Sequence, residues 1–197
     1  MFLPAVATES ATLAGYADQQ IEALRAAPLG LTEEQSRETP CRSALSVGGI
    51  LKHIVYGIRG TLRDLGPEGA RMQLDEADFA EHAQSFALGE GETTAGVLAE
   101  LDELRPLLLA ALEAADPGAE VLAPPAPWLG QDQPIPTSRR YALVHVVEEL
   151  ARHAGHIDII REQIDGVTVP TLVLTRAGVP ANPFFEPYVP APGTIDA

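Results

Sequence analysis

Hydrophobic residues recur every three or four positions in four long stretches of this chain. That spacing is typical of amphipathic α-helices that bury one face against a neighbour. The predicted helices cover about residues 10–27, 46–65, 93–116 and 138–165. Connections containing proline and glycine separate them. Four long helices joined in this way predict an all-α protein with a four-helix bundle.

Two of these stretches contain residues that disfavour a regular helix. Pro106 predicts a kink or a break near Arg105 in the third helix. Glycines interrupt the second, and each costs up to about 1 kcal/mol relative to alanine. Their number suggests either a close approach of another segment or room for a ligand. These glycines are Gly48, Gly49, Gly57 and Gly60.

The segments between and after the long helices are less regular. Residues 77–84 predict a short helix inside an acidic stretch, and the proline-rich residues 124–136 are expected to run extended. Residues 167–197 contain too much proline for a further helix, so we expect an extended tail over the bundle. This tail is expected to bury Phe184, Phe185 and Tyr188. With no long linker, residues 1–197 are expected to form a single domain.

Composition narrows the possible functions. The net charge is −15, which disfavours binding to nucleic acids and to anionic membrane surfaces. We expect no membrane span and no signal peptide, because no apolar run reaches about 18–20 residues and the first residues lack a basic region. The single cysteine, Cys41, excludes an intrachain disulfide and has no basic partner in sequence. A cytoplasmic protein is therefore expected.

The fourth predicted helix contains a polar stripe made of four potential metal ligands. His145, Glu149 and His153 are spaced by four residues, and His156 follows three later. At about 100° per residue, all four lie within roughly 40° of Glu149 on the helix surface. A histidine and a carboxylate four residues apart can hold one divalent metal ion. A solvated helix flank is the alternative interpretation of the same pattern.

A metal site needs a further ligand from another helix, because Glu149 and His153 alone do not complete a coordination shell. His53 and His82 are the candidates. His82 lies in the acidic, irregular segment and is expected on the surface. His53 lies in the second predicted helix with apolar residues at helical spacing, so it is expected to face the core. It is therefore the best-placed third ligand, although a hydrogen-bonded histidine at the core edge would give the same pattern.

Two motifs extend this interpretation to a known family. The sequence reads LKHI at residues 51–54 and HVVEELARHAGHIDIIREQIDG at residues 145–166. Both resemble the DinB-like helix-bundle superfamily, and more narrowly its mycothiol S-transferases and the related maleylpyruvate isomerase. Residues 86–103 and 123–128 fit the same group, so the resemblance covers about residues 10–190. It implies a DinB-like four-helix bundle with an extended proline-rich tail at residues 167–197.

The resemblance also implies roles for individual residues. It assigns the metal to His53, Glu149 and His153, with glutamate at position 149 as in the maleylpyruvate isomerase type. His156 stands where related proteins often have glutamine, so it is expected to face the substrate. His145 is expected to support the site. Arg152 and Trp128 are expected to bind the substrate or to line its pocket, and Arg161 is a further candidate. For the two arginines, surface ion pairs with Glu148 and Glu162 are the alternative.

Two imidazoles and one carboxylate leave a divalent ion with an open coordination position, which is typical of catalytic sites. Zinc is the expected metal, and nickel, manganese and iron tolerate the same ligands. The resemblance implies an enzyme of detoxification that activates a low-molecular-weight thiol, mycothiol, as a metal-bound thiolate for attack on a small electrophile. A metal-dependent hydrolase or isomerase and a non-catalytic stress-response protein are the alternatives. The sequence does not distinguish a monomer from a homodimer.

Overall fold

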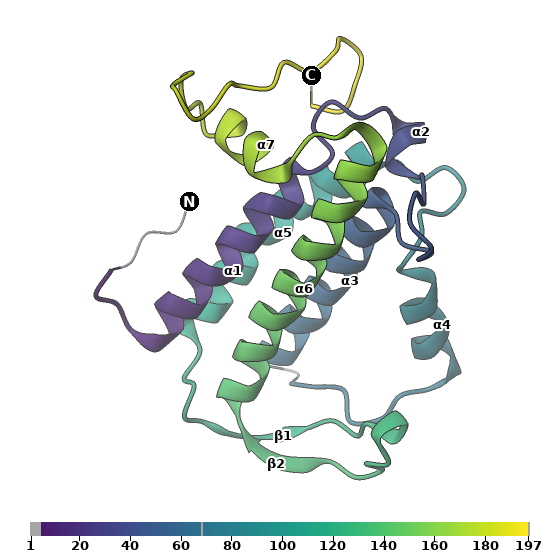
Figure 1. Cartoon of the computed structure of the whole chain (residues 1–197). Coiled ribbons are helices and arrows are strands. Elements are labelled where there is room, and N and C mark those ends of the chain that lie inside the picture. Colours follow the sequence, from purple (N-terminus) through teal and green to yellow (C-terminus); the bar gives the residue numbers. More distant parts are fainter. Residues whose placement is uncertain (1–4, 68, 197) are drawn as a thin grey trace.

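Four long helices form the main body of the protein in a computed structural model that describes residues 5–67 and 69–196. Their bounds lie within two residues of the predicted ranges. Each packs against two of the others: α1 and α3 both contact α5 and α6 (Figure 1). The four are α1 (Glu9–Ala26), α3 (Val47–Leu65), α5 (Thr94–Ala114) and α6 (Arg139–Asp165).

Aliphatic side chains at helical spacing build the core between these helices. Burying them removes apolar surface from water, which is the main force holding the helices together. Because few aromatic residues are available, leucine, isoleucine, valine and alanine provide most of the packing. Fully buried examples from the four helices are Ile21, Leu24, Ile50, Leu51, Leu101, Leu108 and Ile157.

Hydroxyl side chains start most of the long helices. Thr8, Ser46 and Thr93 each accept a hydrogen bond from a backbone N–H of the first turn, which satisfies a donor that the helix itself leaves unpaired. Of the two alternatives predicted at Pro106, a break is wrong, because α5 continues through this residue. Pro106 is exposed, so the carbonyl group that loses its helical partner there lies where solvent can reach it.

The glycines of α3 fulfil both predicted roles, at different positions. A side chain on Gly48 would collide with Leu88, and one on Gly49 would collide with the backbone carbonyl of Phe86. These two glycines therefore let residues 86–88 lie directly on the helix. A side chain on Gly57 would meet no atom within 4 Å, so this glycine borders open space.

The connection between α5 and α6 is a β-hairpin, which the sequence prediction missed. Strands β1 (Glu120–Ala123) and β2 (Ile135–Ser138) pair antiparallel, with Glu120 opposite Ser138. The short 3-10 helix η1 (Pro127–Leu129) lies near the tip. The fold is thus mostly helical with a small two-stranded sheet, rather than purely helical.

The segment after α6 also departs from the prediction. A further helix, α7 (Val169–Arg176), follows directly, so the expectation of a wholly extended tail is wrong. Its proline, Pro170, stands in the first turn, where no helical N–H bond is lost. Phe184 is 98% exposed rather than buried. Tyr188, in contrast, packs over the Arg161 guanidinium, 5.7 Å from its ring centre.

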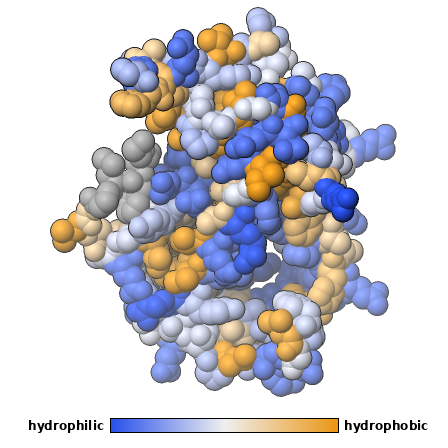
Figure 2. All heavy atoms as spheres, in the orientation of Figure 1, coloured by the Kyte–Doolittle hydropathy of each residue, from blue (hydrophilic) through white to orange (hydrophobic). Residues whose placement is uncertain are grey.

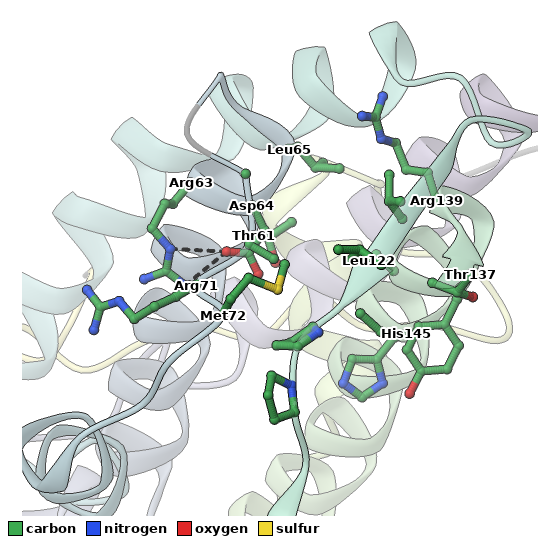
Figure 3. A pocket seen from close by; sticks show the side chains of 18 of the residues that line it. Thr61, Arg63, Asp64, Leu65, Arg71, Met72, Leu122, Thr137, Arg139 and His145 are labelled. Carbon is green, nitrogen blue, oxygen red and sulfur yellow. Dashed lines mark hydrogen bonds and ion pairs between the residues drawn. The ribbon is translucent and has the colours of Figure 1, made fainter. Parts of the chain in front are cut away.

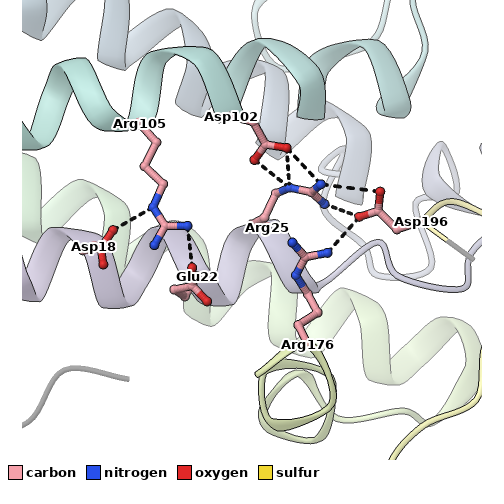
Figure 4. A network of polar contacts seen from close by, with 7 residues as sticks. All are labelled: Asp18, Glu22, Arg25, Asp102, Arg105, Arg176 and Asp196. Atoms are coloured by element: carbon pink, nitrogen blue, oxygen red, sulfur yellow. Dashed lines mark hydrogen bonds and ion pairs between the residues drawn. The ribbon is translucent and has the colours of Figure 1, made fainter. Parts of the chain in front are cut away.

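Buried arginines fix one end of the molecule. Figure 4 shows Arg25 of α1 between Asp102 of α5 and Asp196, which also pairs with Arg176 of α7. Arg161 of α6 is 0% exposed and donates to the Ala27 and Leu29 carbonyl oxygens at 2.6 and 2.7 Å. These contacts join α1, α5, α6 and the C-terminal segment.

Two further helices are short: α2 (Glu33–Ser36) and α4 (Glu76–Gln84). The latter corresponds to the short helix predicted at residues 77–84, and it stands away from the long helices on the side of α3 (Figure 1). Within the described residues, the search for a helix long and apolar enough to cross a membrane found none.

Candidate metal centre

His53 of α3 and the pair Glu149 and His153 of α6 converge on one point between the two helices. One ligand atom from each lies within 4.8 Å of the other two. The two imidazole rings are 4.9 Å apart between their centres. The structure therefore brings together the three residues that the sequence singled out as a metal site.

The local sequence explains why these side chains meet. Glu149 and His153 are one turn apart on α6, so both side chains reach the same side of the helix. His153 is 6% exposed, whereas Glu149 stands at the edge of the core, half-buried. On α3, His53 belongs to the buried face and is 9% exposed. The ring of Phe86 stacks on His53 with 3.9 Å between ring centres, which holds the imidazole in place.

Ser85 determines which nitrogen of His53 is free. The Ser85 hydroxyl donates its hydrogen to the His82 carbonyl oxygen at 2.6 Å. It lies 2.8 Å from Nδ1 of His53, so it must accept the second hydrogen bond from that nitrogen. Nδ1 of His53 consequently carries the proton, and Nε2 keeps its lone pair. Hydrogen bonds of this kind orient histidines that bind metals.

Both imidazoles are kept in the neutral form that metal binding requires. Burial, reinforced by the neighbouring His153 and His82, lowers the pKa of His53 from 6.5 to about 4. Burial also lowers the pKa of His153, against the opposing effect of the Glu149 carboxylate. Nδ1 of His153 is buried and, within the described part of the chain, has no hydrogen-bond partner. An unpaired buried polar atom costs about 1–3 kcal/mol, so its retention calls for an explanation.

A cavity of about 210 Å³ opens beside the three residues. Gly57, one turn after His53, and Tyr56 contribute to its wall from α3, and Val146 and Leu150 do so from α6. The missing side chain of Gly57 is therefore what leaves space next to the candidate ligands. The three donors thus border a space that a small molecule can enter.

The other residues predicted around the site do not all lie beside the three candidate ligands. His145 lines this cavity, and its Nδ1 donates a hydrogen bond to the Glu148 carboxylate at 3.2 Å. The His156 ring lies 5.3 Å from that of His153, on the exposed side of α6. Arg152 is exposed and pairs with Glu148 at 2.9 Å. Trp128 lies apart from the three donors, in the wall of a second cavity.

Sequence reasoning missed two residues near the centre, Ser85 and Phe86, and it considered His82 only as the less favoured third ligand. His82, predicted to be a surface histidine, is exposed but also lines the small cavity, and its ring centre is 5.6 Å from that of His53. All three belong to α4 or the turn after it, a stretch with weak periodicity. The one available signal was Gly49, which admits the backbone of Phe86 against α3.

Together, the fold and the three converging residues define the class of protein. It is a mostly helical protein in which two histidines and a glutamate form a candidate site for a divalent metal. The family model for Mycothiol-S-transferase matches residues 12–166, which is more than half of the chain. The protein therefore belongs to the mycothiol S-transferase family, a DinB-like family. Comparisons with curated proteins and with solved structures returned no match.

Proposed function

We propose that this protein is a metal-dependent S-transferase that joins a low-molecular-weight thiol, mycothiol, to a small electrophilic molecule. Membership of the mycothiol S-transferase family supports the transferase activity and the thiol. The observation that carries the metal dependence is the convergence of His53, Glu149 and His153 beside a cavity. We further infer that the four long helices form the four-helix bundle of DinB-like proteins.

The donor set fits a divalent ion with room for one more ligand. Nitrogen and oxygen donors suit zinc in a catalytic site, and nickel, manganese or iron would accept them too. Nε2 of His153, which lies 3.8 Å from a Glu149 carboxylate oxygen, and the free Nε2 of His53 are the nitrogens that such an ion would use. Bound at this position, the ion would lower the pKa of a coordinated thiol and so favour its thiolate form.

Residues of the chain prepare the site for this chemistry. Ser85 orients His53, and the carboxylate of Glu149 offsets part of the positive charge. Phe86 covers one face of His53, which keeps water from that side. The protein needs no nucleophilic cysteine of its own, because the thiol is a substrate; Cys41 packs against the core.

Glu149→Gln, with Glu162→Gln as its matched control on the exposed side of α6, tests this function. The assay is single-turnover formation of the conjugate between mycothiol and monobromobimane. We expect Glu149→Gln and His153→Ala each to lower the rate by about a hundredfold or more, because even partners of metal ligands cost 10–100-fold. Glu162→Gln should retain the wild-type rate.

Metal analysis of the purified protein completes the test. Elemental mass spectrometry should find about one divalent ion per chain, and His153→Ala should lose it. Equal rates for wild type and His153→Ala would overturn the proposal. Turnover of an electrophile without any thiol would replace the transferase with a metal-dependent hydrolase or isomerase. If the purified protein holds no stoichiometric metal, this result would favour a non-catalytic function.

A further inference from the structure

A second, larger cavity of about 710 Å³ lies between α3, α6 and the β-hairpin. Its walls come from the end of α3 and the segment after it, from β1 and η1, and from the first two turns of α6 (Figure 3). The volume lies within the range of about 300–1,000 Å³ that is usual for small-molecule sites. The space-filling view shows a hollow between these elements (Figure 2).

The large cavity adjoins the small cavity at the metal centre. Thr61 of α3 and His145 and Val146 of α6 line both. A molecule held in the large cavity can therefore contact side chains that also border the space beside His53, Glu149 and His153. The two cavities form adjoining compartments of one site.

The walls of the large cavity are mainly apolar. They include Leu65, Met72, Leu122, Trp128 and Val146, together with the alanines and prolines of residues 123–126. Uncharged polar side chains also reach these walls, but the apolar ones predominate; the polar ones are Thr61, Thr137, Ser138 and Tyr141. Apolar side chains offer no partners to hydroxyl groups, and burying an unpaired hydroxyl is unfavourable. The compartment therefore suits a mostly apolar molecule better than a sugar-bearing thiol such as mycothiol.

Charged residues at this cavity do not converge on its interior. Arg63 pairs with Asp64 at 2.9 Å, and Arg71 pairs with Asp78 of α4. Figure 3 shows the Arg139 guanidinium directed away from His145. An uncharged occupant therefore matches the walls better than a carboxylate or a phosphate.

We propose that this large cavity binds the apolar body of an uncharged electrophile and presents its reactive carbon at Thr61, His145 and Val146. The proposal rests on the transferase function proposed above and names its acceptor class. With a halomethyl acceptor, the thiolate sulfur attacks the methylene carbon and an S–C bond forms. The carbon–halogen bond breaks, the halide leaves with the electron pair, and the thiol proton is released to solvent.

Binding can be measured without any reaction, because Trp128 is the only tryptophan in the chain and lines the cavity. The probe is syn-(methyl,methyl)bimane, an unreactive fluorophore that indole quenches on contact. Wild-type protein should quench it saturably in the absence of thiol and metal. Trp128→Phe should bind the probe in equilibrium dialysis but not quench it. Absence of saturable binding to the wild type would overturn the proposal.

Kinetics with two electrophiles then test the compartment in catalysis. Leu122→Glu places a charge in the cavity wall, and its matched control is Leu107→Glu at an exposed leucine of α5 outside the walls. Leu122→Glu should lower kcat/KM for monobromobimane by about tenfold or more. It should change the rate with the small, polar iodoacetamide by less than about twofold. Leu107→Glu should change neither rate, and the product is measured as the thiol conjugate.

The outcomes separate this proposal from the function on which it rests. If Leu122→Glu lowers both rates equally while it unfolds at the wild-type temperature, the acceptor does not occupy this cavity. If wild-type protein conjugates neither electrophile, the transferase function fails, and the dimethylbimane measurement still shows whether the cavity binds an apolar molecule.

Discussion

Helix α6 carries two buried polar groups only two turns apart, Arg161 and His153, and they have opposite surroundings. Arg161 makes four hydrogen bonds: it donates to two carbonyl oxygens of the loop after α1 and to both carboxylate oxygens of Asp165. His153 has a buried nitrogen, Nδ1, without a partner in the described part of the chain, and its ring lies close to two other potential ligands beside a cavity. Removing a buried charge that its surroundings bind leaves those partners unpaired and destabilises the fold, whereas a group that converges with other donors on a cavity is available for binding.

The same contrast separates two ends of the molecule. The end that contains Arg25, Arg161 and Asp196 closes on itself through ion pairs and backbone hydrogen bonds. The end that contains the β-hairpin and α4 encloses two adjoining cavities instead. Substitutions at the first end should therefore change stability, and substitutions at the second should change binding.

Arg161→Met should have the largest effect on stability, and it tests the end of the molecule that ion pairs and backbone hydrogen bonds close. Removing the guanidinium leaves the Ala27 and Leu29 carbonyls and the Asp165 carboxylate without their buried partner. We expect a loss of about 3–5 kcal/mol in the free energy of unfolding, measured by urea denaturation. Zinc affinity below the unfolding transition should stay at the wild-type value. A variant that loses zinc affinity but keeps its stability would reverse the roles assigned to the two groups.

Ser85→Ala tests the other end of the molecule, where the candidate ligands border a cavity. Without the hydroxyl, Nδ1 of His53 loses the acceptor that fixes its proton there. We expect the Kd for zinc, measured by competition with a chromophoric chelator, to rise about 10–100-fold. Ser85→Thr, which keeps the hydroxyl, should recover most of the affinity. If alanine and threonine give the same Kd, Ser85 fills space but does not orient His53.

Two glycines of α3 sharpen the comparison within one helix. Gly49→Ala should destabilise the protein by about 1–3 kcal/mol, because the new methyl group collides with the Phe86 carbonyl. Gly57→Ala should be neutral or stabilise it by up to about 1 kcal/mol, since the space is open and alanine favours a helix. Thermal unfolding of both variants shows whether each substitution stabilises or destabilises the protein. A destabilised Gly57→Ala would show that the cavity beside His53 is smaller than described.

The pH dependence of stability gives the smallest expected effect. In the metal-free protein the native pKa of His53 is about 4, below its usual 6.5, so the unfolded chain takes up protons first as the pH falls. Stability should therefore decrease from about pH 6.5 to pH 4 and level off below, by at most about 1.4 kcal/mol per pH unit for this residue. His53→Asn should flatten this dependence in urea titrations. Arg161→Met should leave its slope unchanged.

The long helices and the three converging residues were accessible to sequence reasoning because both depend on helical periodicity. Glu149 and His153 are one turn apart, and His53 shares spacing with the apolar face of α3. The β-hairpin was not accessible: its strands have four residues each and are only partly buried, so the alternation that marks a strand is weak. The helix α7 was missed because the proline content of residues 167–197 argued against any helix, although Pro170 stands in the first turn.

The surroundings of the candidate metal centre were predicted least well, for a physical reason. Ser85 and Phe86 reach His53 through tertiary contacts that depend on where α4 and its following turn lie, and local sequence carries little information about that placement. Similarly, the spacing on α6 alone indicated four potential ligands, and only the resemblance gave them different roles. The structure separates them by burial: His153 is buried and His156 is exposed.

The β-hairpin is joined to the long helices chiefly at its base, where Arg139 and Arg140 donate backbone hydrogen bonds to the Ala119 and Pro117 carbonyls. Its tip touches α4 through the edge-to-face contact of Trp128 with Phe79. The hairpin contributes a wall of the large cavity and none of the three candidate ligands. Mutations can therefore accumulate in this segment, and reshape the space that an acceptor would occupy, while the ligand geometry set by α3 and α6 is inherited unchanged. Such a division makes the protein readily evolvable toward new small molecules.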